Sequence, residues 1–147
     1  MDKKAYLSGF ADGEGCFSVT FNKSKRHKFG WDIRPSFSVS QNSDRAEVLN
    51  IFKDDFKCGL IRPDRSDRTL KYEVRSIRDL IEVVIPHFES YPLLSGKHKD
   101  FTVFSEICKR MYNQEHLRKD GLKEIVHMAQ ALNPSSRKRF PRSMIKI

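Results

Sequence analysis

Several stretches of the sequence alternate apolar and polar residues with a period of two, which is typical of strands that bury one face. In the first of them Phe17, Val19 and Phe21 fall on one side, with hydroxyl and amide residues on the other. The strands predicted in this way cover residues 16–23, 31–41, 60–62 and 70–75. Short polar segments join them in pairs, the second around Pro63 and Asp64, so two β-hairpins are expected.

Apolar residues recur at helical spacing before, between and after these hairpins. The predicted helices cover residues 3–13, 44–56, 77–88, 97–113 and 118–131. Asp2 and Ser43 are expected to cap the first two helices, and Pro86 should kink or stop the third. The order helix, hairpin, helix, hairpin, helices predicts an α+β fold, in which helices cover one face of a four-stranded antiparallel sheet. We expect one domain, residues 1–133, followed by a tail, residues 134–147.

The charge of the chain narrows the class of its partner. Lysine and arginine number 28 against 19 acidic residues, which gives a net charge of +9 and a pI near 9.6. Such a surface favours polyanions, either nucleic acid or an anionic membrane. The sequence has no apolar run of about 18 residues and no signal-peptide core after Met1, so we expect an intracellular protein that does not enter membranes. The tail, 134–147, holds five basic residues and no acid, and is predicted to be mobile and able to touch phosphate.

The three cysteines and five histidines suggest neither a zinc site nor a disulfide framework. Cys16, Cys58 and Cys108 are odd in number, far apart and without a C-x-x-C pair, so they are predicted to be buried thiols in a reducing compartment. No two histidines stand at the i, i+4 spacing of the zinc-binding H-E-x-x-H helix.

The sheet face that the helices leave uncovered is predicted to be polar and basic. A two-stranded ribbon of this kind can enter the DNA major groove, where Arg and Lys meet phosphates and alternate side chains reach base edges. The alternative interpretation is a sheet face that is merely solvated. We expect DNA contacts from Ser18, Thr20, Asn22, Ser24, Lys25, Arg26, Lys28, Asp32, Arg34, Ser36, Ser38, Ser40, Arg62, Arg65, Arg68, Lys71, Glu73 and Arg75.

Residues 7–15, Leu-Ser-Gly-Phe-Ala-Asp-Gly-Glu-Gly, contain two features that are unfavourable in an isolated helix. Gly9 and Gly13 lie on one helical face, although a glycine in a helix costs about 1 kcal/mol relative to alanine. At this spacing two helix backbones can approach closely. Asp12 and Glu14 stand at the C-terminal end of the helix, where the macrodipole disfavours carboxylates and a bound cation would favour them. The alternative is a simple helix stop, with acids in a turn for solubility.

At this motif the sequence resembles the LAGLIDADG homing endonucleases. The positions that match are Leu7, Gly9, Asp12, Gly13 and Gly15, with Glu14 at the second acid of the motif. The conservative departures are Ser8, Phe10 and Ala11. The resemblance extends through an αββαββα order across about residues 5–110, and it implies that fold. It also implies site-specific cleavage of double-stranded DNA in intron homing, within a bacterial cytoplasm or an organelle such as a chloroplast or mitochondrion.

The resemblance implies that the motif helices of two units pack together, with contacts from Leu7, Ser8, Gly9, Phe10, Asp12 and Gly13. Since the sequence holds one copy of the motif, a complete site requires a homodimer and a near-palindromic target. The implied metal ligands are Glu14 and the Gly13 carbonyl, with Mg²⁺ or another divalent cation such as Mn²⁺ as the cofactor. Asp12 is expected to be structural, either contacting its twin helix or capping backbone amides.

Three further catalytic residues are implied beside Glu14: Gln41 to position water, Arg45 near the scissile phosphate, and Lys97 after a proline-leucine turn. Gln41 can instead cap the next helix, Arg45 can be an exposed first-turn residue, and Lys99 can take the place of Lys97. No small-molecule substrate is expected. The rival functions are an intron maturase or transcription regulator without cleavage, which the acid Glu14 argues against, and an RNA-binding module. An RNA-binding module would need aromatic residues at the middle of its exposed strand faces to stack on bases, and this sequence has none there.

Overall fold

The structure, a computed structural model, describes residues 1–132 and 145–147, without the side chains of Ser66 and Asp67. The strands are β1 (Gly15–Lys23), β2 (Trp31–Asn42), β3 (Leu60–Asp64) and β4 (Ser66–Val74). The helices are α1 (Lys3–Glu14), α2 (Glu47–Phe56), α3 (Ile77–Asp79), α4 (Ile85–Ser90), α5 (Lys97–Tyr112) and α6 (Lys119–Ala129). Shorter turns are η1 (Ser43–Arg45), η2 (Leu80–Val84) and η3 (Glu115–Leu117).

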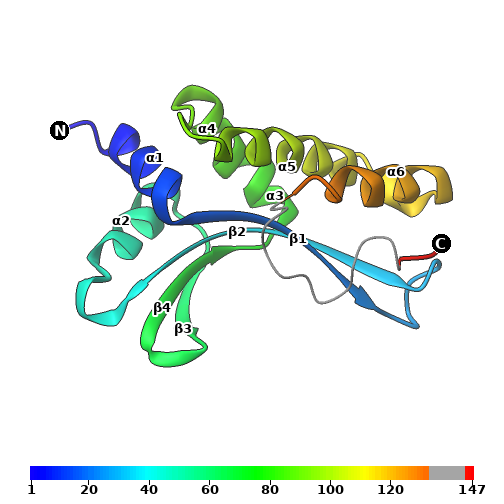
Figure 1. The fold of residues 1–147 in the computed structure, drawn as a ribbon, viewed down its shortest axis with the longest axis horizontal. Coiled ribbons are helices and arrows are strands. Elements are labelled where there is room, and N and C mark those ends of the chain that lie inside the picture. The colour runs from blue at the N-terminus through cyan, green and yellow to red at the C-terminus, as the bar shows by residue number, and fades with distance from the viewer. Residues whose placement is uncertain (133–144) are drawn as a thin grey trace.

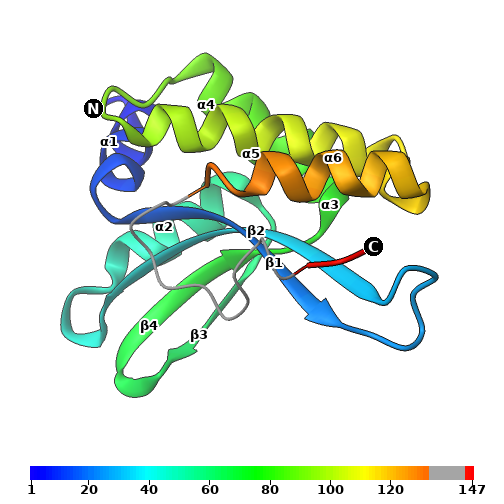
Figure 2. The same ribbon diagram turned by 45° about the vertical axis from the view of Figure 1, so that its right-hand side comes forward.

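The strands form one antiparallel sheet in the order β1-β2-β4-β3. Helices α4, α5 and α6 lie along one face of this sheet, with α1 and α2 at one end (Figure 1). Figure 2 shows the opposite face of the sheet arching away from the helical layer. The predicted α+β fold, with helices covering one face of a four-stranded antiparallel sheet, is confirmed.

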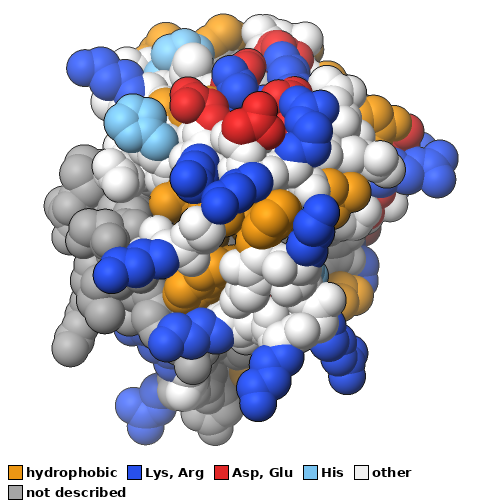
Figure 3. Space-filling view, turned by 90° about the vertical axis from the view of Figure 1, so that its right-hand side faces the viewer, with side chains coloured by type: hydrophobic (Ala, Val, Ile, Leu, Met, Phe, Trp, Pro, Cys, Tyr) orange, Lys and Arg blue, Asp and Glu red, His pale blue; other side chains and the backbone are white. Residues whose placement is uncertain are grey.

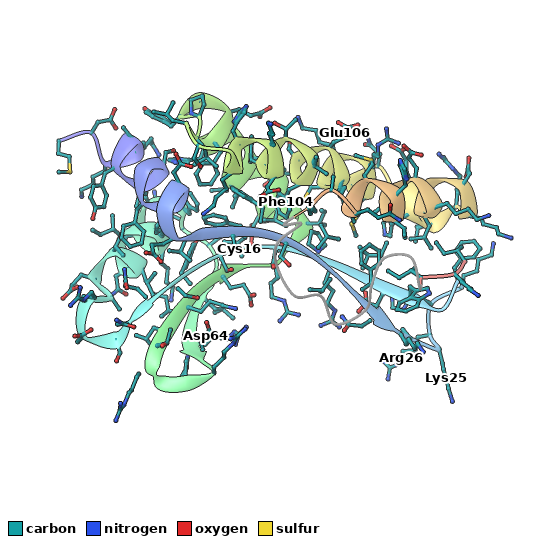
Figure 4. The ribbon with its side chains drawn as sticks, in the orientation of Figure 1. Cys16, Lys25, Arg26, Asp64, Phe104 and Glu106 are labelled. Atoms are coloured by element: carbon teal, nitrogen blue, oxygen red, sulfur yellow. The ribbon has the colours of Figure 1, made fainter. Side chains whose placement is uncertain are left out.

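Phenylalanine side chains fill the space between the two layers. The ring centroid of Phe17 lies 5.2 Å from that of Phe37, 5.4 Å from that of Phe88 and 5.3 Å from that of Phe104. All four side chains are fully buried, and Figure 4 locates Phe104 between α5 and the sheet. Burying a side chain of this size stabilises a fold by about 1.5–3 kcal/mol. The alternation of apolar residues in β1 and β2 therefore determines which sheet face turns toward the helices.

One of the two predicted helix caps is present. Asp2 caps α1, because its carboxylate accepts a hydrogen bond of 3.2 Å from the Ala5 amide. Ser43 does not cap α2, and that prediction is wrong. The chain first makes the 3₁₀ turn η1, and α2 begins at Glu47 after Ala46, which makes no side-chain cap. Since Ala46 is buried, the turn brings the chain onto the core before the helix starts.

The second hairpin turns one residue later than predicted. Its turn is at Arg65, which has a left-handed φ of 59°, while Pro63 and Asp64 belong to β3 and pair with β4. Proline is tolerated here because β3 is the edge strand, where a missing backbone N–H leaves no ladder bond unmade.

The third predicted helix continues past Pro86 instead of stopping there. It runs as α3, η2 and α4 up to Ser90. Proline lacks an N–H group, and its ring clashes with the carbonyl four residues earlier in a regular helix. The segment before Pro86 is a wider π turn, in which the Ile85 amide donates to the Leu80 carbonyl. This turn accommodates the proline while Leu80, Val84 and Phe88 stay buried.

Residues 134–144 of the predicted basic tail, 134–147, lie outside the described residues, and only residues 145–147 of it are described. The last residues return to the first hairpin, because Ile145 is buried and the Trp31 indole donates a hydrogen bond of 3.1 Å to the Lys146 carbonyl. None of the helices in residues 1–132 combines the length and the apolar character that crossing a bilayer requires.

Candidate DNA interface and active site

Helix α1 runs directly into β1, and this bend positions the predicted metal ligands. Gly15 follows Glu14 immediately, and a Cβ atom at Gly15 would lie 2.7 Å from the Ala11 carbonyl oxygen. Only glycine permits so close an approach of the two backbones. Gly13 and Glu14 are exposed at the bend. In the described part of the chain, the Glu14 carboxylate has no hydrogen bond or ion pair.

The predicted catalytic Lys97 lies behind the same bend. Its ammonium group donates hydrogen bonds to the Ala11 carbonyl at 3.1 Å and the Gly15 carbonyl at 2.6 Å. A cation is favoured there because the C-terminal end of a helix carries the negative end of its dipole. Lys97 therefore ties the first turn of α5 to the bend that carries Glu14. Lys99, the alternative, is exposed to solvent.

Asp12 binds the loop before α5, which is one of its two predicted structural roles. Its carboxylate accepts hydrogen bonds from the Leu94 and Ser95 amides, both at 3.0 Å, and from the Ser95 hydroxyl. The Ser95 hydroxyl oxygen in turn accepts from the Lys97 amide at 3.2 Å. Burial alone would raise the pKa of Asp12, but the hydrogen bonds from Ser95 and Leu94 and the Lys97 charge together lower it below its ordinary value. Asp12 thus places the loop that delivers Lys97.

We expect Asp12→Asn to lower the free energy of unfolding by about 1–3 kcal/mol at pH 7, because it weakens hydrogen bonds to a charged acceptor. Since the folded-state pKa is depressed, this stability is present at neutral pH and is lost as the pH falls through the folded pKa. Urea unfolding measures the difference. The matched control is Asp54→Asn, at an exposed position of α2, which should change the free energy by less than about 0.5 kcal/mol. Equal losses in both variants would contradict this role of Asp12.

A hollow of about 430 Å³ opens on the polar side of the sheet beside Glu14. Of the predicted site residues, it brings together Glu14, Ser38, Ser40, Arg65 and Lys71. Asp64 stands among them, accepting a hydrogen bond of 3.0 Å from the Ser40 hydroxyl. Its other carboxylate oxygen lies 3.6 Å from the Lys71 ammonium. Carboxylates, hydroxyls and a lysine around one hollow suit both phosphate oxygens and a hydrated cation.

Sequence reasoning missed three lining residues of this hollow, which are Cys16, Asp64 and Thr69. Figure 4 marks the first two, at the start of β1 and at the end of β3. The prediction that all three cysteines are buried is wrong for Cys16, which is exposed, and for Cys58, which is half-buried. Cys16 pairs with Ser38 across the sheet. The period-two pattern of β1 could have predicted that Cys16 is exposed, because Cys16 lies on the same face of the strand as Ser18.

The predicted DNA contacts lie in cross-strand rows on the open face of the sheet. Thr20 stands opposite Arg34, Ser18 opposite Ser36, Ser40 opposite Lys71, and Lys71 opposite Arg62. Lys25 and Arg26 project at the tip of the first hairpin (Figure 4), and lysine and arginine side chains spread over this end of the molecule (Figure 3). The other predicted DNA contacts that are at least partly exposed are Asn22, Ser24, Lys28, Asp32, Arg65, Arg68, Glu73 and Arg75. Ser38, in contrast, is 8% exposed and reaches only the hollow.

Gln41 and Arg45 lie where β2 leads into α2, and the structure does not bring them into the hollow around Glu14. The Gln41 side-chain carbonyl accepts a hydrogen bond of 3.0 Å from the Asn42 amide, which leaves its NH₂ group available as a donor. Arg45 belongs to η1, and its side chain is 70% exposed, 3.8 Å from the carboxylate of Asp44.

The predicted interface residues of α1 divide between two faces of the helix. Leu7 and Ser8 are buried in this chain's own core, at 0% and 5% exposure, so their side chains cannot contact a second copy. Phe10 is half-buried against the same core. Gly9 and Gly13 are exposed, and a Cβ atom at either would meet no described atom within 4 Å. The open face of α1 is therefore a glycine face.

A buried histidine holds the inner face of α1. The Ser8 hydroxyl donates to the Tyr91 carbonyl at 2.6 Å, so its oxygen can only accept from His87 Nε2, which lies 3.0 Å away. Nε2 of His87 therefore carries a proton. Its Nδ1 atom is buried and has no hydrogen-bond partner among the described residues. Burial, with a smaller effect of Lys4, lowers the pKa of His87 to about 4 from its ordinary 6.5.

We expect the chain to lose stability in mild acid through His87. Between pH 6.5 and pH 4, His87 is protonated in the unfolded chain and neutral in the folded chain. The free energy of unfolding is therefore highest above pH 6.5 and decreases as the pH falls. From pH 7.5 to pH 5 the loss should be about 2 kcal/mol. Urea unfolding of the wild type and of His87→Gln, which retains a donor to Ser8 but does not titrate, measures it. The same pH dependence in both proteins would contradict the assignment.

The family of the chain follows from comparison with known proteins. The family model for LAGLIDADG endonucleases matches residues 7–108, from the α1 motif to Cys108 within α5. The chain belongs to the LAGLIDADG endonuclease family. This LAGLIDADG chain is 35% identical, over 130 residues, to probable intron-encoded endonuclease 2 of Neurospora crassa. That alignment covers 88% of the chain and 29% of the Neurospora protein.

Solved LAGLIDADG structures share the fold. The homing endonuclease I-TnaI superposes with a TM-score of 0.84 at 34% identity, over 90% of each chain. I-SmaMI, bound to an uncleaved DNA target in the presence of calcium ions, superposes with a TM-score of 0.85 at 29% identity. That match covers 91% of this chain and 45% of I-SmaMI. The chain spans between 24% and 29% of the length of three curated intron-related proteins that it matches.

Proposed function

We propose that two copies of this chain form a homodimeric, divalent-metal-dependent endonuclease that cuts double-stranded DNA at a long, near-palindromic site in intron homing. The observation that carries the proposal is the α1–β1 bend. It presents an exposed Glu14 carboxylate beside Gly13, on a helix whose open face is glycine, and no described residue pairs with that carboxylate. Membership of the LAGLIDADG family supports the reaction class. Intron-encoded relatives such as the Neurospora crassa protein support an organelle as the setting.

The glycine face supports the homodimer. Nothing within the described chain requires glycine at position 9 or 13, since a Cβ atom at either meets no neighbour. Each glycine in a helix costs about 1 kcal/mol relative to alanine, so a contact with another molecule is expected to offset this. Close packing of two α1 helices about a twofold axis provides that contact and brings two Glu14 carboxylates together. Leu94, 94% exposed beside α1, adds apolar surface there.

The residues at the bend fit a divalent cation. Glu14 and the Gly13 carbonyl offer hard oxygen ligands, which Mg²⁺ and Mn²⁺ prefer. Within residues 1–132 and 145–147, no three His, Cys, Asp or Glu side chains converge on one point. The chain alone therefore provides too few ligands, and the rest would come from the second copy and DNA phosphates. When bound, a divalent cation would supply an activated water and charge stabilisation for phosphodiester hydrolysis, with Glu14 and the Gly13 carbonyl as its ligands from this chain.

The other site residues act around the cleaved bond. Lys97 holds the bend through the Ala11 and Gly15 carbonyls, and so fixes the direction in which Glu14 points. Arg45, with its exposed guanidinium, would pair with the scissile phosphate. Gln41 would donate from its side-chain NH₂ group to the attacking water.

The first hairpin would supply most of the recognition. β1 has nine residues, which extend over about 30 Å at roughly 3.3 Å per residue. That length follows about nine base pairs at roughly 3.4 Å each. Two copies therefore read a long site, and the twofold axis makes it near-palindromic.

A cleavage selection on a randomised, near-palindromic DNA library, with and without Mg²⁺, tests the proposed function. Enrichment of one long palindrome-like site that is cut only with a divalent metal is the expected result. Enrichment by binding without cutting in any divalent metal would contradict it. That outcome would support the second candidate, a cleavage-deficient maturase or transcription regulator on the same scaffold.

A further inference from the structure

Asp32 and Glu73 each lie beside arginines of the DNA-facing sheet, where a negative charge opposes phosphate binding. Asp32 forms an ion pair with Arg34, and Glu73 forms ion pairs with Arg62 and Arg75. These acids weaken the attraction between the sheet and the DNA backbone. Any favourable effect on DNA binding must therefore come from how they position the arginines that they pair with.

Asp32 is anchored from both sides. One carboxylate oxygen accepts a hydrogen bond of 2.7 Å from Arg34 Nε, and the other lies 3.5 Å from His27 Nε2. The second ring nitrogen of His27 lies 2.7 Å from the Ser24 hydroxyl oxygen. A chain of contacts therefore runs from the hairpin tip to Arg34. The Asp32 side chain is 21% exposed and the Arg34 side chain 54%, so the acid is sheltered and the arginine projects.

The contact through Nε leaves the two terminal nitrogens of Arg34 without a partner in the described part of the chain. Together they form the planar fork that matches O6 and N7 of guanine in the major groove. The contacts of Glu73 differ. Arg62 uses a terminal nitrogen at 3.1 Å, and Arg75 Nε lies 4.0 Å away. Of these three arginines, only Arg34 combines a close contact to an acid with two terminal nitrogens that are both available for a base.

We propose that Asp32 is a positioning residue that aims Arg34 at a guanine, so that each half of the DNA target contains a G·C pair read by Arg34. This rests on the proposed function, because it requires the sheet to lie in the major groove of a DNA target. The negative charge of Asp32 also disfavours a phosphate beside Arg34. Both effects direct the arginine to a base edge instead of the DNA backbone.

The strand register locates this base pair within the half-site. Gly15, next to Glu14, pairs with Val39, and Arg34 stands five residues farther along β2 (39 − 34 = 5). At roughly 3.4 Å per residue this separation is about 17 Å. The guanine is therefore about five base pairs farther from the target centre than the position of Glu14.

The cleavage selection, repeated with variants, tests this assignment. Wild type should prefer guanine roughly 5- to 150-fold at the predicted position, as is typical of one bidentate pair. Asp32→Asn and Arg34→Ala should both reduce this preference toward equal use of the four bases, with other positions unchanged. Asp32→Glu should retain part of it. The control Glu82→Gln removes a similar acid–arginine contact, at 3.2 Å from Arg78 on the helical side, and should leave every position unchanged.

An unchanged guanine preference in Asp32→Asn would overturn the proposal. So would a uniform loss of preference at all positions, because that would show a general structural defect instead of the loss of one aimed contact. A wild-type selection that yields a cleaved site without guanine near the predicted position would overturn the proposal and leave the proposed function standing. If the wild type enriches no site, the proposed function itself fails.

Discussion

Glu14→Gln should reduce DNA cleavage by about 10²–10³-fold or more, the range expected when a group that stabilises charge in the transition state is lost. The carboxylate is exposed at the α1–β1 bend and has no partner among the described residues, so the fold does not depend on its charge. Glutamine keeps the size of the side chain and removes the anionic metal ligand. DNA binding should therefore persist with a similar salt dependence, while the chemical step fails.

Single-turnover cleavage of the selected site, beside equilibrium binding at several salt concentrations, measures both quantities. The matched control is Glu47→Gln, which removes an exposed acid from the first turn of α2 and should cut at the wild-type rate. Cleavage by Glu14→Gln at the wild-type rate would show that the metal ligand has been assigned to the wrong residue.

Gly9→Leu should prevent dimerisation without unfolding the chain. A leucine side chain at this position meets open space in the single chain, and replacing a helical glycine favours the helix by about 1 kcal/mol. In a dimer packed through α1, the same side chain is inserted twice into a close contact, and each insertion costs about 1–3 kcal/mol. The dimer dissociation constant should therefore rise by about 30-fold or more. Cleavage should fall with it, since the two Glu14 carboxylates separate.

Sedimentation over a range of concentrations measures the dissociation constant, and urea unfolding measures the stability of the chain. Glu124→Leu is the matched control, because it adds the same side chain to an exposed position of α6, at the opposite end of the molecule from α1 (Figure 1). It should leave the dimer unchanged. A Gly9→Leu protein that dimerises as tightly as the wild type would exclude packing through the glycine face.

Local patterns predicted most of the fold because the burial of each strand face follows directly from the alternation of side chains along it. Phe17 and Phe37 could be assigned to the core in this way, and the basic hairpin tip around Lys25 to the surface. The turn at Arg65 and the π turn before Pro86 could not be predicted. Each depends on how a proline fits a strand or helix whose neighbours are distant in the sequence.

The candidate site was only partly predictable, because the sequence identified its ligand-type residues but not the residues that they contact. The unfavourable acids at the end of α1 singled out Asp12 and Glu14. Their different roles depend on long-range contacts. Asp12 binds backbone amides more than 80 positions away, at Leu94 and Ser95, while the Glu14 carboxylate bonds to no residue that the structure describes. Asp64 looked like a turn residue in the sequence. It lines the hollow because β3 extends two residues further, to Asp64, than the pattern indicated.

The central claim, that each chain contributes one half of a two-strand cutting site, is tested most directly by a mixed dimer. Wild type and Glu14→Gln carrying different affinity tags are co-expressed, the heterodimer is isolated through both tags, and it is incubated with Mg²⁺ and a supercoiled plasmid that contains the selected site. A nicked circle is the expected product, because one intact Glu14 serves one strand. Linear product from the heterodimer, or full cleavage by a species that sediments as a single chain, would contradict it.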